Sequence, residues 1–228
     1  MFDRIAPSYD ILNRILSVSI DRYWRKKTIQ SLHIEQNCLV LDIATGTGDL
    51  ALGALQDTSC RVVGIDLSLG MLRQATRKSG LYLNNRFFMI NGDATSLPFR
   101  DGVFDRAMIA FGIRNVSGVD RCLDEMCRVV KPAGIIAILE LSVPPSPLFR
   151  KAYFAYFKHI LPLVGGLISG NTRAYRYLHD SVVDFLSPGK LVKMMEEKGC
   201  TVALRSFFGG VARLYLITRG TGEEKKDD

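Results

Sequence analysis

Histidine, tryptophan and cysteine are scarce in this 228-residue chain, which holds three, one and five of them. The histidines do not stand at the spacings of a metal site, so the sequence predicts no metal centre. The cysteines are odd in number, form no C-x-x-C pair and lie mostly inside apolar runs. They indicate reduced thiols in a core rather than disulfides or zinc ligands. These residues are His33, His159, His179, Cys38, Cys60, Cys122, Cys127 and Cys200.

Long apolar runs are also missing from the chain. The longest, near Leu161–Ile168, falls far short of the roughly 18 residues that a membrane-spanning helix needs. The opening Met1–Arg4 leads into a mixed polar segment, unlike a signal peptide. We therefore expect a cytoplasmic chain whose only contact with a membrane is peripheral, at the inner face.

Acidic residues are in the minority, since 30 Lys and Arg face 23 Asp and Glu, for a net charge of +7. A basic balance suits a nucleic acid, an anionic membrane surface or an acidic small molecule, and composition does not choose among them. With 47% hydrophobic residues, the chain has enough apolar material for one sizeable core. Its length predicts a single domain over residues 1–220, followed by a charged tail at 221–228.

From residue 38 onward, short apolar runs alternate with longer amphipathic ones. Runs such as Leu39–Leu41 and Ile135–Leu139 are apolar on both faces, as a parallel sheet covered by helices requires. The pattern predicts an α/β fold with a doubly wound, mostly parallel, Rossmann-like sheet of seven strands. The expected strands are 38–44, 61–65, 86–90, 104–109, 135–141, 201–208 and 211–218, and the expected helices are 48–56, 68–79, 119–130 and 188–198.

Two segments depart from this alternation. Residues 1–37 indicate an N-terminal cap that is helical over 8–37, in which Ser8 or Asp10 would cap one helix and Asp21 would begin the next. Residues 144–186 predict a helical lid insertion that is rich in aromatic side chains. After it come the last helix and two strands, whose connection through Gly209 suits a tight hairpin turn.

The strongest local signal is a buried strand, Val40–Ala44, that runs into the small-residue loop Thr45–Gly48 and then a helix. Glycines let the backbone approach a ligand closely, and a helix N-terminus offers unpaired N–H groups. Because Asp66 follows Gly46 by twenty residues, the loop also fits a dinucleotide-binding fingerprint. A purely structural turn is the third interpretation.

Three aspartates narrow these alternatives. Asp42 ends the first predicted strand, Asp66 ends the second and Asp93 follows the third, so we expect them along one carboxyl edge of the sheet. The carboxylate of Asp66 suits the hydroxyls of a ribose, from which it can accept hydrogen bonds. The carboxylate of Asp93 suits the amino group of an adenine, and the N–H of Ala94 beside it can donate to a ring nitrogen. The carboxylate of Asp42 would repel a pyrophosphate but attract an ammonium or sulfonium group. A ligand with adenosine, no phosphate and a cationic amino acid end is S-adenosylmethionine rather than NAD.

With these residues the chain resembles the class I S-adenosylmethionine-dependent methyltransferases, with Ala44 in place of the first loop glycine of that family. The turn Arg128–Gly134 resembles the family too, and Gly134 is expected to supply a positive φ there. The cofactor-binding residues that the resemblance implies are Asp42, Gly46, Thr47 and Gly48 at the methionine end, Asp66 at the ribose, and Asp93 and Ala94 at the adenine.

Four more segments narrow the resemblance to the quinone-ring C-methyltransferases of menaquinone and ubiquinone biosynthesis. It covers residues 2–219 and implies a polyprenyl quinol acceptor: demethylmenaquinol first, or else 2-methoxy-6-polyprenyl-benzoquinol. One departure is Asp21, where that family usually has a histidine; a helix N-cap accounts for the aspartate. The segments are Phe2–Asn13, Ala110–Val116, Glu140–Pro144 and Tyr175–Leu178.

Methylation of a quinol ring carbon requires that a phenolic proton leave or be strongly hydrogen-bonded. A fixed cation near the phenol oxygen and a dry pocket both help. The candidate catalytic residues are Arg114 as that cation, the neighbouring Asn115, and Tyr9 as a second polar contact. A structural ion pair for Arg114 and simple packing for Tyr9 are the alternatives. Asp10 is a proton acceptor or a helix cap.

Residues 145–180 carry five Lys and Arg against one Asp, among aromatic and Leu-Ile pairs. This composition is typical of an interfacial helix, where a lipid-tailed substrate would enter, and also of a lid that packs on the sheet. Rival functions are another small-molecule methyltransferase, an RNA-binding protein or RNA methyltransferase, and an inactive cofactor-binding module. Because the basic residues are dispersed, we expect no nucleic acid partner. The sequence leaves open whether the chain forms a homo-oligomer.

Overall fold

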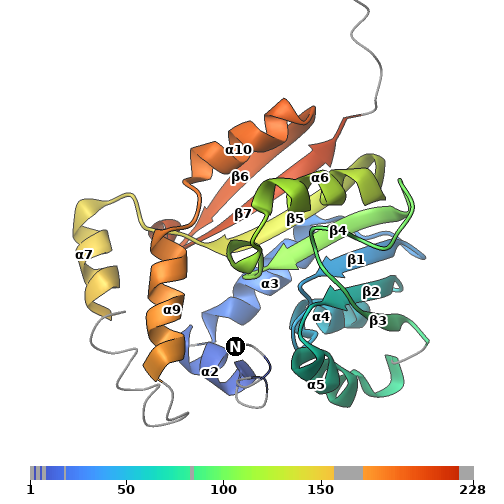
Figure 1. Ribbon diagram of the computed structural model, residues 1–228, viewed down its shortest axis with the longest axis horizontal. Helices are drawn as coiled ribbons and strands as arrows, with labels where there is room; N and C mark the ends of the chain where they lie inside the picture. Colours follow the sequence, from blue (N-terminus) through green and yellow to red (C-terminus); the bar gives the residue numbers. More distant parts are fainter. Residues whose placement is uncertain are drawn as a thin grey trace, which may run out of the picture.

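The computed structural model describes Asp3, Ala6 and residues 9–17, 19–82, 85–156 and 172–220. A seven-stranded sheet crosses the molecule in the order β3-β2-β1-β4-β5-β7-β6 (Figure 1). Neighbours among the first five strands pair in parallel, while β7 runs antiparallel to both β5 and β6. The doubly wound, mostly parallel fold is therefore confirmed. The strands are β1 Leu39–Ile43, β2 Arg61–Asp66, β3 Phe87–Asn91, β4 Phe104–Ala110, β5 Val130–Leu141, β6 Cys200–Phe207 and β7 Ala212–Arg219.

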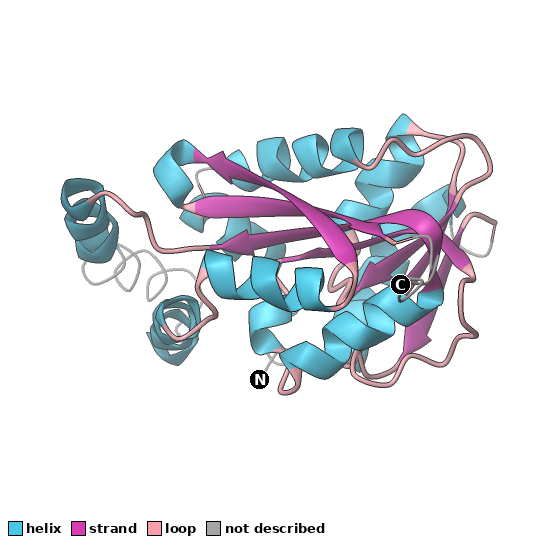
Figure 2. Cartoon of the chain, turned by 90° about the horizontal axis from the view of Figure 1, so that it is seen from above, coloured by secondary structure: helices cyan, strands magenta, loops and turns pink. Residues whose placement is uncertain are grey.

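Helices cover both faces of this sheet (Figure 2). One core cluster joins the sheet to α6 and α10, and a second joins its other face to α3 and α4. Along β5, Ile136 and Ile138 enter the first cluster, whereas Ala137 and Leu139 enter the second. This alternation explains why the strand is apolar throughout. The helices described are α2 Tyr9–Leu16, α3 Ile20–Ser31, α4 Asp49–Asp57, α5 Leu69–Ser79, α6 Val119–Val129, α7 Pro147–Ala155, α9 Thr172–Val183 and α10 Pro188–Glu197, with short 3₁₀ turns η2 Gly80–Tyr82, η3 Ile113–Asn115 and η5 Phe208–Gly210.

The entry into β5 differs from the prediction. The strand begins at Val130 rather than at residue 135, because a register shift between Phe104 and Arg106 of β4 admits extra residues. The positive φ expected at Gly134 is wrong, since it occurs at Ala133, with φ 59°. Gly134 is required for space instead: a Cβ there would lie 2.5 Å from Cγ1 of Val130.

The N-terminal helical cap contains α2 and α3, and the prediction that Asp21 caps α3 is wrong. Ser19 occupies the cap position, with φ 60°, and Asp21 lies inside the first turn, 5% exposed. Asp10 is likewise inside the first turn of α2. Both aspartates are therefore available for contacts that a helix cap would not make.

The helical lid contributes α7 and α9, which stand beside α2 on one side of the molecule (Figure 1). Tyr153 of α7 packs against Leu178 of α9 and Val211 near β7. The rest of the insertion, residues 157–171, and the charged tail 221–228 lie outside the described residues. In the part of the chain that the structure covers, no helix is long and apolar enough to cross a bilayer.

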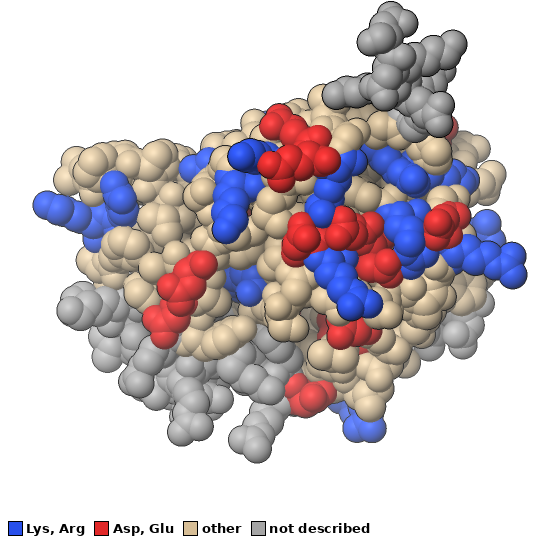
Figure 3. All heavy atoms as spheres, turned by 45° about the horizontal axis from the view of Figure 1, so that its top comes forward, with Lys and Arg blue, Asp and Glu red and all other residues tan. Residues whose placement is uncertain are grey.

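On the face shown in Figure 3, Lys and Arg side chains are interleaved with Asp and Glu. Ion pairs among the described residues include Lys198 with Asp120 and Asp124, and Lys131 with Asp105. The positive charge on this face is therefore locally balanced and does not form a continuous basic groove.

Candidate functional site

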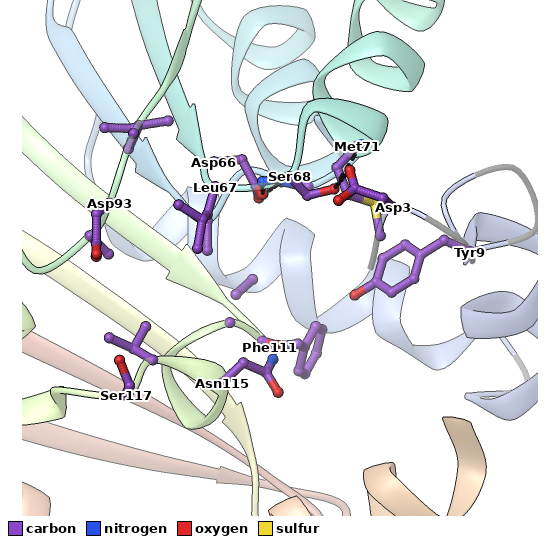
Figure 4. A pocket seen from close by; sticks show the side chains of 18 residues that line it. Asp3, Tyr9, Asp66, Leu67, Ser68, Met71, Asp93, Phe111, Asn115 and Ser117 are labelled. Atoms are coloured by element: carbon purple, nitrogen blue, oxygen red, sulfur yellow. Dashed lines mark hydrogen bonds between the residues drawn. The ribbon is translucent and has the colours of Figure 1, made fainter. Parts of the chain in front are cut away.

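Two cavities of similar size, about 270 and 290 Å³, lie side by side beyond the carboxyl ends of the central strands. The first cavity is formed by the loops after β1, β2, β3 and β4 (Figure 4). The second is enclosed by α2, α3, η3, α7, α9 and η5. Tyr9 and Phe111 line both cavities, so these two rings form the boundary between them.

The small-residue loop after β1 forms part of the wall of the first cavity. Its backbone is left-handed at Ala44, Gly46 and Gly48, with φ of 49°, 58° and 81°. A Cβ at Gly48 would lie 3.3 Å from both Ala75 and Phe87, so this helix cap has no room for a side chain. The loop therefore approaches the cavity through bare backbone, as the motif predicts.

Asp42 lies beneath this loop rather than in the cavity wall. Its side chain is 1% exposed, and Oδ2 accepts a hydrogen bond of 2.6 Å from Oγ1 of Thr45. Burial raises the pKa of Asp42 to about 7, although Thr45 and Arg25 act in the opposite direction. The Gly loop thus covers the carboxylate of Asp42, and a positive charge bound on the other side of the loop would favour the ionised form of that carboxylate.

Asp66 and Asp93 line the first cavity directly. Asp66 accepts hydrogen bonds of 2.8 Å from the backbone N–H groups of Gly46 and Ser68, and burial raises its pKa. Asp93 accepts from the backbone N–H and the hydroxyl of Thr95, which lower its pKa. Both carboxylates are held rigidly by these donors and retain acceptor positions for a ligand.

The donor set of the first cavity fits adenosine with a cationic end better than a dinucleotide. Its described lining includes Asp3, Asp66 and Asp93 but no Lys or Arg that would compensate a pyrophosphate. Ala94, Ile65 and Leu67 supply apolar surface for a base, and Leu67 is 73% exposed at the rim. This chemistry is what S-adenosylmethionine requires.

Asp3 lines the first cavity and makes contacts there that sequence reasoning missed. Asp3 accepts hydrogen bonds from the Ser68 hydroxyl (2.8 Å) and the Gly70 N–H (2.7 Å) at the start of α5. The N–H of Gly70 is the main reason that the pKa of Asp3 is lowered. No local pattern marks Asp3, because its partners are more than sixty residues away.

A second clamp holds α2 against the Gly loop. Asp10 accepts from the Thr47 hydroxyl (2.5 Å) and from Nζ of Lys78 (2.7 Å), and Lys78 also pairs with Asp49 at the start of α4. Thr47, predicted at the methionine end, is 3% exposed and engaged in this clamp. Asp10 therefore fastens the N-terminal segment instead of capping its helix.

The second cavity combines an apolar wall with a polar row. The apolar wall is contributed by α3, the loop after β4, α7, α9, η5 and the end of β5, and the polar row comes from α2, α3 and the turn between them. The apolar residues are Ile20, Trp24, Phe111, Leu141, Phe149, Leu178, Phe208 and Val211, joined by the rings of Tyr153 and Tyr156. A largely apolar ligand with a few polar groups fits such a cavity.

Arg114 and Asn115, predicted as catalytic, occupy neighbouring places on η3. Arg114 lines the second cavity, yet its guanidinium donates to Glu140 (2.5 Å) and to the carbonyl of Phe111 (2.8 Å). The ion pair with Glu140 is buried, with side chains 8% and 1% exposed. Asn115 lines the first cavity, and its Oδ1 accepts from the hydroxyl of Tyr177 at 2.9 Å. Arg114 is thus both part of the cavity wall and a structural ion pair.

The structure therefore brings most of the predicted residues together. Those that line a cavity are Tyr9, Gly46, Asp66, Asp93, Ala94, Arg114 and Asn115. Asp42, Thr47 and Gly48 are not among the described lining residues: Asp42 lies beneath the Gly loop, and Thr47 and Gly48 form the part of that loop that leads into α4. The described residues include no group of three His, Cys, Asp or Glu side chains that could hold a metal ion.

Known structures match the whole architecture. A SAM-dependent methyltransferase of Thermotoga maritima superposes with a TM-score of 0.65 at 18% identity, over 96% of this chain and 97% of the other. A SAM-dependent methyltransferase of Aquifex aeolicus gives a TM-score of 0.59 at 17% identity, over 85% and 88%. At such identities the likeness establishes the fold.

Sequence comparison identifies the family. The model of the ubiE/COQ5 methyltransferase family matches residues 1–219. Over 94% of this chain and 91% of the relative, 46% of residues are identical to a ubiquinone/menaquinone biosynthesis C-methyltransferase UbiE of Syntrophotalea carbinolica. Over 96% and 100%, 43% are identical to a demethylmenaquinone methyltransferase of Thermus thermophilus. The chain therefore belongs to the ubiE/COQ5 methyltransferase family.

Proposed function

We propose that this enzyme transfers the methyl group of S-adenosylmethionine to a ring carbon of a demethylated polyprenyl quinol. The observation that carries the proposal is the pair of adjoining cavities: one suits an adenosine with a cationic end, the other an apolar ring with polar substituents, and they meet at Tyr9 and Phe111. Demethylmenaquinol is the first acceptor, in keeping with relatives that are named demethylmenaquinone methyltransferases.

The first cavity holds the methyl donor, which supplies an electrophilic methyl group on a cationic sulfur. Asp66 binds the ribose hydroxyls, and Asp93 with the N–H of Ala94 binds the adenine. Asp42 lies beneath Gly46 and Thr47 and favours the cationic methionine end by its negative charge. The clamps at Asp3 and Asp10 keep water out of the space between donor and acceptor.

The second cavity holds the acceptor ring against the boundary with the first. Arg114 stabilises the phenolate of the acceptor from a fixed position, because Glu140 and the Phe111 carbonyl hold its guanidinium. Tyr9 and Asn115 offer polar contacts to the acceptor ring on the side that faces the methyl donor, since both residues line the first cavity. The surrounding aromatic side chains exclude water and so favour the neutralisation of phenolate by sulfonium.

A labelled-methyl transfer assay with a naphthoquinol and a benzoquinol, both prenylated, tests this function. Transfer to the naphthoquinol is expected, and the ubiquinone/menaquinone name of one relative supports the benzoquinol as second candidate. Asp66→Ala should weaken cofactor binding at least tenfold, whereas Asp57→Asn, at an exposed site on α4, should not. A parent enzyme that methylates neither quinol would overturn the assignment.

Arg114 needs a conservative variant in this assay. Removing the guanidinium would leave Glu140 buried and unpaired, at a cost of about 3–5 kcal/mol, so Arg114→Ala is expected to unfold. Arg114→Lys keeps the charge and loses the forked hydrogen bonds, and a fall of about tenfold in kcat with unchanged cofactor affinity is expected. A kcat equal to that of the parent would remove Arg114 from the mechanism.

The prenyl tail gives α7 a role at a membrane. This helix exposes Leu148 (81%) and Phe149 (42%) beside the exposed Arg150 and Lys151, and Phe149 also lines the second cavity. Apolar side chains flanked by basic ones are typical of a segment that rests on an anionic bilayer. The acceptor then enters the cavity along α7 with its tail still in lipid.

Flotation with vesicles tests this docking. Vesicles of phosphatidylglycerol should carry the parent enzyme with them, and vesicles of phosphatidylcholine much less. Leu148→Asp should abolish flotation, whereas Leu81→Asp, at a leucine 95% exposed on η2, serves as the matched control. Equal flotation by both variants and the parent would refute a membrane-binding face at α7.

A further inference from the structure

The polar row of the second cavity follows a four-residue period. Tyr9, Asn13, Ser17, Asp21 and Arg25 all line the cavity and succeed one another at intervals of four. Although α2 ends at Leu16 and α3 begins at Ile20, all five line the same cavity, so α2, the turn and α3 together present a polar edge to the ligand. Each member therefore faces whatever enters the cavity.

Asp21 is the chemically distinctive member of this row. It is the one carboxylate among the described residues that line the second cavity, and it is 5% exposed. Its Oδ1 accepts a hydrogen bond of 2.6 Å from the Ser17 hydroxyl. Its Oδ2 lies 3.6 Å from Nε of Arg25, an ion-pair distance that is too long for a hydrogen bond.

This carboxylate is incompletely satisfied by the protein. An ionised carboxylate offers about four acceptor positions, and within the described chain Ser17 fills one of them. Burying such a group is costly unless a partner completes it. Nε of Arg25 is likewise buried without a hydrogen-bond partner among the described residues. A ligand hydroxyl that donates to Asp21 would complete this arrangement.

We propose that Asp21 is the general base of methyl transfer, an inference that rests on the function proposed above. Its carboxylate accepts the proton of an acceptor-ring hydroxyl as the O–H bond breaks. The electron pair moves through the ring, whose nucleophilic carbon forms a bond to the methyl group. The bond from methyl to sulfur breaks, and its pair remains on sulfur as S-adenosylhomocysteine. The ring carbon then loses its hydrogen as a proton to water, and the phenolate regains a proton from Asp21.

The other polar groups suit different tasks. Arg25 and Arg114 stay protonated, so they stabilise a phenolate and cannot take its proton. Glu140 is occupied by Arg114 and by the N–H of Leu141. Arg25 also lies over the ring of Phe111, at 5.1 Å, which fixes it at the boundary between the cavities. Asp21 is thus the proton acceptor of this cavity, and the guanidinium groups of Arg25 and Arg114 are the cations beside it.

Asp21→Asn is the decisive variant, because it preserves shape and cannot accept a proton. We expect kcat for a prenylated naphthoquinol to fall by about 10²- to 10⁴-fold, with cofactor affinity within twofold of the parent and an unchanged circular dichroism spectrum. Asp57→Asn is the matched control and should leave kcat unchanged. Asp21→His restores a base and should recover at least tenfold over Asp21→Asn.

The pH profile separates a base from a structural aspartate. The acid limb of kcat should differ between the parent and Asp21→His, because an imidazole then replaces the carboxylate as the proton acceptor, whereas a purely structural Asp21 would leave the limb unchanged. The other titratable or charged groups among the described residues that line this cavity, namely Tyr9, Arg25, Arg114, Tyr153 and Tyr156, are common to both proteins.

The outcomes are distinguishable. A parent enzyme without activity on any quinol overturns the proposed function and Asp21 with it. An active parent together with a fully active Asp21→Asn overturns Asp21 alone. A lowered melting temperature with unchanged kcat of the folded protein would make Asp21 a structural residue.

Discussion

Asp42→Asn should make the ligand-free enzyme more stable at neutral pH while impairing its function. The carboxylate is 1% exposed, and burial raises its pKa to about 7 from the reference value of 3.8. The native state therefore holds this proton more tightly than the unfolded chain does. The resulting stability is complete below about pH 4 and is lost as the pH rises through 7.

The magnitude follows from the same values. Each unit of pKa difference corresponds to about 1.4 kcal/mol, so a rise from 3.8 to about 7 amounts to roughly 4 kcal/mol lost by pH 8. Asn stays neutral and retains an oxygen that can accept from Oγ1 of Thr45, at the position of the present 2.6 Å bond. It should therefore avoid most of this loss.

Urea unfolding of the ligand-free proteins between pH 5 and 8.5 measures the effect. The free energy of unfolding of Asp42→Asn minus that of the parent should increase steadily up to pH 7 and level off above it. Taking the difference between variants removes the titration of groups that do not interact with Asp42. The same difference for Asp57→Asn should stay flat. A difference for Asp42→Asn that does not change with pH would refute the reasoning.

Asp42→Asn should weaken cofactor binding, although it stabilises the ligand-free protein. A cationic ligand above the Gly loop favours ionised Asp42, so binding of S-adenosylmethionine to the parent should release a proton near pH 7. Calorimetry in two buffers of different ionisation enthalpy detects that release. In Asp42→Asn it should disappear, and the affinity should fall about tenfold or more.

Two variants and one oxidation experiment test the surrounding structure. Ala44→Gly should raise the free energy of unfolding by about 1 kcal/mol in chemical denaturation, because Ala44 has a φ of 49° that glycine adopts without strain; an unchanged value would contradict this. Lys78→Met removes the cation that holds Asp10, so KM for the cofactor should rise several-fold and hydrogen exchange of α2 should accelerate; unaltered exchange would show that the clamp is dispensable. Cys127 and Cys200 have sulfur atoms 3.6 Å apart, so the thiol oxidant diamide should join them in a disulfide that peptide mass mapping detects, and persistently free thiols would refute it.

The sheet and the cofactor edge could be predicted because their signals are local. Val40 and Leu41 alternate between two buried faces, and an aspartate stands at or near the carboxyl end of each of β1, β2 and β3, which parallel pairing brings to one edge. The glycines of the loop after β1 mark a turn whose backbone no other residue fits well. Such short-range patterns predict the structure well because any residue in a parallel strand must follow the same alternation, and because the strands share one carboxyl edge.

The clamps and the β5 entry could not be read from the sequence. Asp3 and Asp10 find partners 65 or more residues away on α5, and nothing near them in the chain indicates those contacts. The bulge before β5 places the positive φ on Ala133, although Gly134 is the residue that propensity favours. Aspartate is a residue type that favours helix caps, which is why the sequence predicts a cap at Asp21. Its spacing of four residues from both Ser17 and Arg25 indicates the contacts that the structure has.

The N-terminal segment makes the two cavities depend on each other. Asp3 and Asp10 fasten it to α5 and to Thr47 beside the Gly loop, and Tyr9 between them borders both cavities. The same continuous segment carries Ser17 and Asp21 into the acceptor cavity. Asp10, next to Tyr9 in the chain, is hydrogen-bonded to Thr47 of the Gly loop, so a contact made at the donor side also fixes a residue in the wall of the acceptor cavity. A change in the Gly loop is therefore felt at Tyr9, and through it at the place where the two cavities meet.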